Sequence, residues 1–89
     1  MSTVFLALQT NDDTRPLIEA ILADNPQAVL REEPAMVKID AEGSLVVRRS
    51  SIEAILGRPF DLQELQINLI SLSGHVDETD DEFTLSWAH

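Results

Sequence analysis

Short apolar runs, several with alternating apolar and polar positions, recur along the chain. A two-residue period is typical of strands that bury one face. In FTLSW, for example, Phe83, Leu85 and Trp87 share one face and are expected to pack in the core. The pattern predicts six strands, at residues 4–9, 28–32, 35–40, 44–48, 64–74 and 83–87.

Two segments repeat apolar residues at helical spacing instead. The first is an apolar stripe at residues 17–22, preceded by Pro16, which suits a first helical turn because its N–H is not needed there. DNP at residues 24–26 ends this helix, since the residue before a proline avoids the α region. The second helix covers residues 50–57, where Ser50 and Glu53 have capping-box spacing and Gly57 occupies the usual C′ position.

Both predicted helices contain the pentapeptide IEAIL, at residues 18–22 and 52–56. Either two helices converged on the same packing need, or a β-α-β-β unit was duplicated. Between the halves, AEG predicts a hairpin turn in which Gly43 takes a positive φ. The element order predicts an α+β fold: a single small domain over residues 1–89, with two β-α-β-β-like halves and helices packed on a mainly antiparallel sheet.

The predicted strand at residues 64–74 does not keep its alternation. Leu65, Ile67 and Leu69 share the expected core face, whereas Ile70 and Leu72 lie with Asn68 on the opposite face. If that face is exposed, it is a small apolar patch among hydroxyls and an amide, which suits a docking surface. A β-bulge that rotates the strand is the structural alternative.

The chain is strongly acidic, with a net charge of -10 from 16 Asp and Glu against six Lys and Arg. No Lys or Arg follows Arg58, and residues 77–82 form a predicted acidic loop. Nucleic acid and anionic membranes are therefore poor partners. We expect Asp77, Asp80 and Asp81 to steer association with a partner that presents positive charge.

The sequence offers little material for catalysis. It lacks cysteine, a phosphate-binding glycine motif and a calcium-loop pattern, so no cofactor and no metal site are expected. His75 beside the acidic loop does not make a ligand cluster, and Ser50 and Ser51 are better explained as helix caps than as nucleophiles. The absence of cysteine, of a signal peptide and of a membrane-length apolar run favours a cytoplasmic protein.

Several segments together resemble the effector, or coupling, proteins of bacterial multicomponent monooxygenases, in the phenol hydroxylase branch. The resemblance extends from residue 4 to residue 87, and its specificity comes from the order and spacing of the segments. These are RPLIEAILADNPQA (15–28), PAMVKIDAEG (34–43), LGRPFD (56–61), NLISLSG (68–74) and the closing FTLSW. The methane monooxygenase branch is a more distant match and carries terminal extensions that this chain lacks, so roles of those tails are not implied.

The resemblance implies a non-catalytic protein without a cofactor. Such proteins dock on an oxygenase (hydroxylase) component with a di-iron centre, tune oxygen and substrate access, and help couple electron delivery from a reductase to hydroxylation. By family position, Asn68, Ser71 and Gly74 fall in the segment expected to face the oxygenase. The face argument adds Ile70, Leu72 and Ser73 to this candidate docking segment.

Two other classes of function remain open on the sequence alone. A small-molecule-sensing regulatory module would have a ligand pocket between its halves and would melt at a ligand-dependent temperature. An acidic inhibitor or polyanion mimic would bind a basic protein through residues 77–82 with steep salt dependence.

Overall fold

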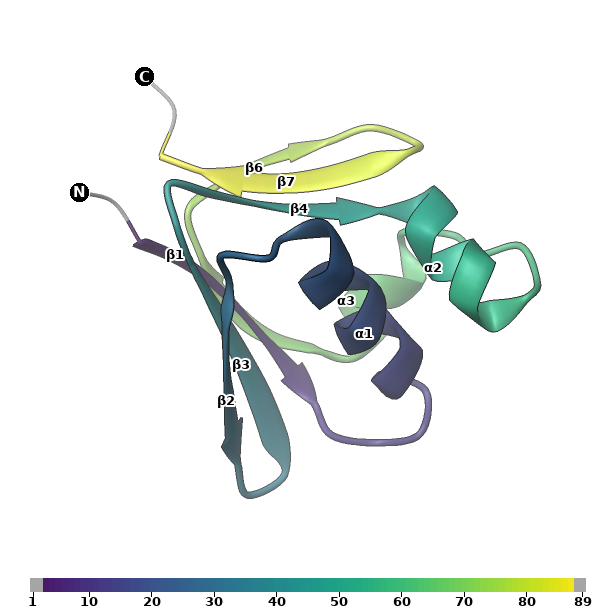
Figure 1. The fold of residues 1–89 in the computed structure, drawn as a ribbon, viewed down its shortest axis with the longest axis horizontal. Helices are drawn as coiled ribbons and strands as arrows, with labels where there is room; N and C mark the ends of the chain where they lie inside the picture. The colour runs from purple at the N-terminus through teal and green to yellow at the C-terminus, as the bar shows by residue number, and fades with distance from the viewer. Residues whose placement is uncertain (1–2, 88–89) are drawn as a thin grey trace.

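The computed structural model describes residues 3–87, which fold into two antiparallel sheets with helices in the angle between them (Figure 1). The first part of the chain forms β1 (Thr3–Gln9), α1 (Arg15–Asp24), β2 (Val29–Glu33), β3 (Met36–Glu42) and β4 (Ser44–Arg48). The second part forms α2 (Arg49–Leu56), α3 (Glu64–Ile67), β5 (Leu69–Ser73), β6 (His75–Glu78) and β7 (Glu82–Ser86). Within these residues, no helix has the length and apolar character needed to cross a bilayer.

The larger sheet has the strand order β2-β3-β1-β5, with every pair antiparallel. Its inner face follows the predicted alternation, because every second residue of β1 and β3 is buried and points to the helices. The cross-strand pairs on this face are Val4 with Ala41, Leu6 with Ile39, and Leu8 with Val37.

The smaller sheet has the order β4-β7-β6 and closes the other side of the core. Leu45 and Val47 of β4 lie opposite Leu85 and Phe83 of β7, and all four are buried. The expectation that Trp87 continues this core face is wrong. Its side chain is 44% exposed, and its ring N–H donates to the carbonyl oxygen of Thr3 at 3.0 Å.

Two glycines carry the chain from one sheet to the other. Gly43, with φ of 88°, joins β3 to β4, and Gly74, with φ of 137°, joins β5 to β6. The predicted hairpin around Gly43 is therefore wrong, although its positive φ is confirmed. β3 pairs with β1 and β2, whereas β4 pairs with β7, because the single-residue corner turns the strand into the second sheet.

Helix α1 ends in a side-chain clamp on the smaller sheet. Asn25 is 4% exposed, and its amide nitrogen donates to the carbonyl oxygens of Ile21 and Val46, both at 2.7 Å. Its amide oxygen accepts the Val46 N–H at 3.0 Å. Asn25 thus occupies the free edge of β4 as a neighbouring strand would, which fixes α1 against this sheet.

Helix α2 starts and ends differently from α1. It begins at Arg49, and Ser50 makes no capping hydrogen bond, so the predicted capping box is wrong. Glu53 instead accepts the N–H of Phe60 at 2.8 Å. The predicted left-handed Gly57 is confirmed, with φ of 72° and its N–H bonded to the Glu53 carbonyl oxygen at 2.8 Å.

The segment predicted as a strand at residues 64–74 begins with the single helical turn α3. Asp61 and Glu64 cap this turn reciprocally: an Asp61 carboxylate oxygen accepts the Gln63 N–H, and Glu64 accepts the Asp61 N–H. Leu65 is fully buried as expected, but Ile67 is 74% exposed and is not a core residue. The α+β class and the single small domain are confirmed, with the strands divided between two sheets.

Candidate functional site

The candidate docking segment forms β5, an edge strand of the larger sheet, together with the residues at its two ends. Its pairing with β1 shifts register: Leu69 lies opposite Leu8, while Ser71 lies opposite Ala7. Ile70 is the extra residue of a β-bulge and is 46% exposed. The bulge considered as the structural alternative is therefore present, and it leaves an apolar side chain at the sheet edge.

The bulge also corrects the face assigned to Leu72. Because one residue is inserted, Leu69 and Leu72 both pack against the hydrophobic core, and Leu72 does not share the exposure of Ile70. Gly74 has a structural role at the corner, since an added Cβ would lie 2.9 Å from Cγ1 of Val4. Neither observation tests partner binding by these two residues, which stays a prediction.

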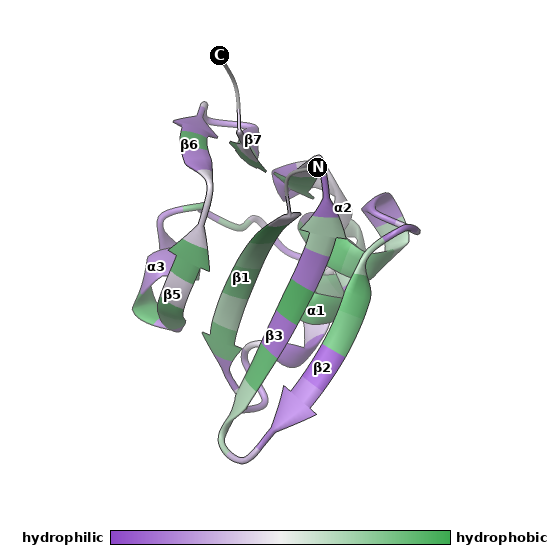
Figure 2. Ribbon diagram, turned by 90° about the vertical axis from the view of Figure 1, so that its left-hand side faces the viewer, coloured by the Kyte–Doolittle hydropathy of each residue, from purple (hydrophilic) through white to green (hydrophobic). Residues whose placement is uncertain are grey.

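Ser71 and Ser73 lie on the outer face of the larger sheet, opposite to the face on which Leu72 packs against the core. Ser71 pairs with Ala7, which is completely buried, and Ser73 pairs with Phe5, which is partly buried. Among residues 3–87, no helix covers this face: in the view of Figure 2, α1 lies behind the sheet and α3 lies beside β5. The Lys38 ammonium lies 4.3 Å from the centre of the Phe5 ring. This face is open to a partner and mixes apolar, hydroxyl and charged groups.

Asn68 ties the start of β5 to the loop before α1. Its side-chain oxygen accepts a hydrogen bond from the Asn11 amide nitrogen at 3.0 Å, and its carbonyl oxygen accepts the Gln9 N–H at 2.9 Å. The side chain of Asn11 also accepts the N–H groups of Asp13 and Thr14. Asn68 therefore lies against the loop that precedes α1, and one partner surface can reach both.

The predicted acidic loop at residues 77–82 is a β-hairpin, because its flanks pair as β6 and β7. Asp77 lies on β6 and is exposed, and Thr79 holds the turn by accepting the N–H groups of Asp81 and Glu82. Asp81 binds the Arg49 guanidinium at 2.7 Å and accepts the Arg49 N–H through its carbonyl oxygen at 2.9 Å. Asp81 is thus partly neutralised, whereas Asp77 and Asp80 have no ion pair among residues 3–87.

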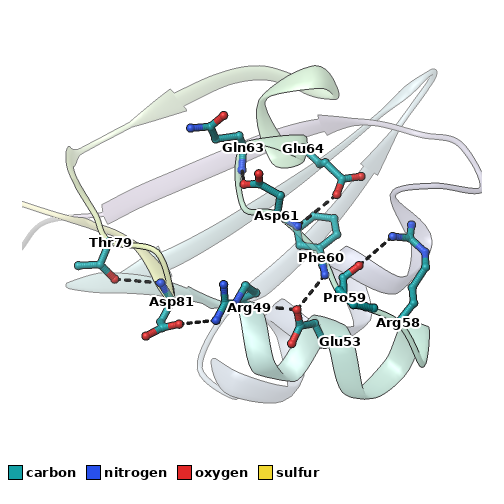
Figure 3. A network of polar contacts seen from close by, with 10 residues as sticks. All are labelled: Arg49, Glu53, Arg58, Pro59, Phe60, Asp61, Gln63, Glu64, Thr79 and Asp81. Atoms are coloured by element: carbon teal, nitrogen blue, oxygen red, sulfur yellow. Dashed lines mark hydrogen bonds and ion pairs between the residues drawn. The ribbon is translucent and has the colours of Figure 1, made fainter.

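A wide concavity of about 1160 Å³ lies where this hairpin, α2, the 57–63 loop and α3 meet, and sequence reasoning did not identify it. Figure 3 shows the contacts that hold its walls together: Arg49 with Asp81, Glu53 with the Phe60 N–H, and Asp61 with Glu64. The spacing Asp61-x-x-Glu64 is a capping-box signal that could have located the helical turn at its edge. The residues that line the concavity include Ile67 and Asp80. We call this concavity the acidic groove.

The titratable residues do not assemble into an ion-binding cluster. Within residues 3–87, no three His, Cys, Asp or Glu side chains are grouped so that they could hold a metal ion. The surface features that remain are the bulged strand β5, the open sheet face beside it, and the acidic groove. Their geometry suits contact with another macromolecule.

Comparison with known proteins identifies the family of this chain. The model of the MmoB/DmpM family matches residues 2–86. The chain is 48% identical over 86 residues to the phenol 2-monooxygenase stimulatory component DmpM of Pseudomonas sp. (strain CF600), covering 97% of this chain and 96% of that protein. It is 28% identical to methane monooxygenase regulatory protein B of Methylosinus trichosporium, covering 96% of this chain and 65% of that longer protein.

The fold is similar to that of a chain in a solved phenol hydroxylase–regulatory protein complex. The TM-score is 0.94 at 49% sequence identity, and the match covers 98% of this chain and 100% of the other.

Proposed function

The chain belongs to the MmoB/DmpM family, and we propose on that basis that it is the non-catalytic regulatory component of a phenol hydroxylase. In this role it docks on the oxygenase component, which carries the di-iron centre, and tunes oxygen and substrate access and the coupling of electron transfer to hydroxylation. The observation that carries the proposal is the full-length likeness to the regulatory chain of a phenol hydroxylase complex. Related proteins are named stimulatory, regulatory or effector components.

The two other classes considered from the sequence are not favoured. A small-molecule sensor and an acidic polyanion mimic would each require relatives of a different kind from the monooxygenase components found. A cytoplasmic location is proposed because small secreted domains commonly carry disulfides, whereas this chain has no cysteine.

The docking surface proposed here is centred on β5. Ile70 supplies an exposed apolar side chain at the bulge, and Ser71 and Ser73 supply hydroxyls on the open face beside it. Asn68 and Gly74 bound this strand, Leu72 supports it from the core side, and Asp77, Asp80 and Asp81 provide negative charge in the following hairpin. An exposed apolar residue among polar groups matches the composition of protein interfaces.

Replacing Ile70 with Asp tests this surface. A carboxylate buried against a partner without a counter-charge loses much of its hydration energy, so binding to the oxygenase should weaken by at least about tenfold. Hydroxylation per NADH consumed should fall in the system reconstituted with oxygenase and reductase. Thermal unfolding of the variant alone should remain close to that of the wild type, because Ile70 is half-exposed.

Val29 provides the matched control. It is an exposed β-branched residue, 55% accessible, on β2 at the opposite edge of the same sheet. Val29→Asp should leave binding and coupling unchanged. A folded Ile70→Asp variant with wild-type affinity and coupling would show that β5 is not the docking strand.

A further inference from the structure

We infer that the acidic groove receives a surface segment of the oxygenase that presents an arginine or lysine beside an apolar side chain. This inference rests on the proposed function, because it assigns a second contact to the same partner. The groove shares Asp80 with the surface centred on β5, but its other lining residues belong to α2, the 57–63 loop, α3 and the β6–β7 hairpin.

The charge of the lining determines the sign of the partner. Five carboxylates line the groove against one guanidinium, that of Arg49; they belong to Glu53, Asp61, Glu64, Glu78 and Asp80. Arg49 is already engaged by Asp81 and Glu53. Within residues 3–87, Glu78 and Asp80 have no side-chain hydrogen bond or ion pair. A cationic side chain from outside would meet these two carboxylates without displacing an internal partner.

An apolar contact is available in the same place. Ile67 lines the groove and is 74% exposed, the largest exposure among the large hydrophobic residues of the described chain. Phe60 and Leu62, which also line it, are almost fully buried and give the floor a fixed apolar base. The groove therefore offers an apolar contact beside negative charge, and a side chain such as arginine or lysine combines an apolar stem with a cationic end.

The groove is held in shape before a partner arrives. Arg49 binds the turn through Asp81 at 2.7 Å, and Glu53 holds the 57–63 loop through the Phe60 N–H at 2.8 Å (Figure 3). Fixed walls reduce the ordering cost of binding. The groove is also continuous with the proposed docking strand, because Ile67 at its rim is followed directly by Asn68 and β5. One partner surface can therefore cover both features.

Charge reversal within the groove tests the inference. In the double variant Glu78→Lys/Asp80→Lys, two carboxylates without internal partners become ammonium groups, so the affinity for the oxygenase component should fall by more than about tenfold at low salt. The matched control is Glu19→Lys/Glu32→Lys, which makes the same change in net charge at exposed residues of α1 and β2. It should change the affinity by less than about twofold, because it leaves the groove intact.

A photo-crosslinker in place of Ile67 then identifies the occupant. Mass spectrometry of the crosslinked complex should find an oxygenase peptide that contains Arg or Lys next to an apolar residue. If the wild-type chain binds the oxygenase but the groove double variant matches its control, the groove inference is wrong while the regulatory function stands. A crosslinked peptide without a basic residue would equally overturn it. If the wild-type chain neither binds nor stimulates the oxygenase, the proposed function itself fails.

Discussion

Helices α1 and α2 contain the same pentapeptide, Ile-Glu-Ala-Ile-Leu, but they bury different residues of it. In α1 the third and fourth residues, Ala20 and Ile21, are almost completely buried. In α2 the first residue, Ile52, is completely buried, while the fourth, Ile55, is 40% exposed. A duplicated unit that kept its packing would bury equivalent positions, so the two copies do not act as structural equivalents.

The difference follows from where each helix lies. Helix α1 packs between the sheets and is clamped to β4 by Asn25, whereas α2 packs beside α1 at the periphery (Figure 1). The residue that a helix buries is set by the direction of its contacts as well as by its own sequence. Identical local sequences therefore predict two helices correctly and leave their orientation open.

The largest expected effect comes from truncating the fourth residue of each pentapeptide. Ile21→Ala should lower the free energy of unfolding by about 3 kcal/mol, because it leaves a cavity in a packed core. Ile55→Ala should cost less than about 1 kcal/mol, because its side chain is already part-exposed. Urea denaturation of both variants measures the difference. Equal losses would show that α2 is buried as deeply as α1.

The two helix ends give a smaller contrast. Asn25→Ala should cost about 2 kcal/mol, because the N–H and carbonyl of Val46 lose their partners at the edge of β4. Gly57→Ala should cost about 1 kcal/mol, because a Cβ is disfavoured at φ of 72° while no neighbouring atom obstructs it. Thermal or urea unfolding separates the two, and a larger loss at Gly57 would contradict the importance of the Asn25 clamp.

The smallest contrast lies between the glutamates at the second position. Glu53→Ala should cost about 1 kcal/mol, because the Phe60 N–H loses its acceptor and the Arg49 contact is removed. Glu19→Ala should change stability by less than about 0.5 kcal/mol, since Glu19 is exposed and its side chain makes no hydrogen bond or ion pair within residues 3–87. Chemical denaturation of both variants under the same conditions measures the difference between their free energies of unfolding. A loss at Glu19 as large as that at Glu53 would remove the contrast.

Local signals predicted much of the fold. Pro16 and Pro26 bracket α1, Gly57 takes the left-handed conformation, and Phe83 and Leu85 lie on a buried strand face. These features depend on the allowed conformations of single residues or on a two-residue period, both of which are visible in sequence.

Features that depend on distant partners were either left open or predicted wrongly. The turn at Gly43 is compatible with either a hairpin or a corner, and only the pairing of β4 with β7 decides between them. The broken alternation around Ile70 is likewise compatible with an exposed apolar face or with a bulge, and the pairing of β5 with β1 shows the bulge. The family resemblance indicated the docking strand, but the acidic groove combines four separate elements and leaves no local pattern.

The pairing of β1 with β5 has a consequence for the synthesis of the chain. Phe5 is made long before its strand partner Ser73. A nascent chain therefore presents the apolar β1 without one of its two neighbours until β5 has left the ribosome, and contacts between distant residues slow folding. Chains that terminate before β5 would expose an unpaired strand edge, a known route to aggregation. The larger sheet cannot close until β5, the last of its four strands in chain order, has been made.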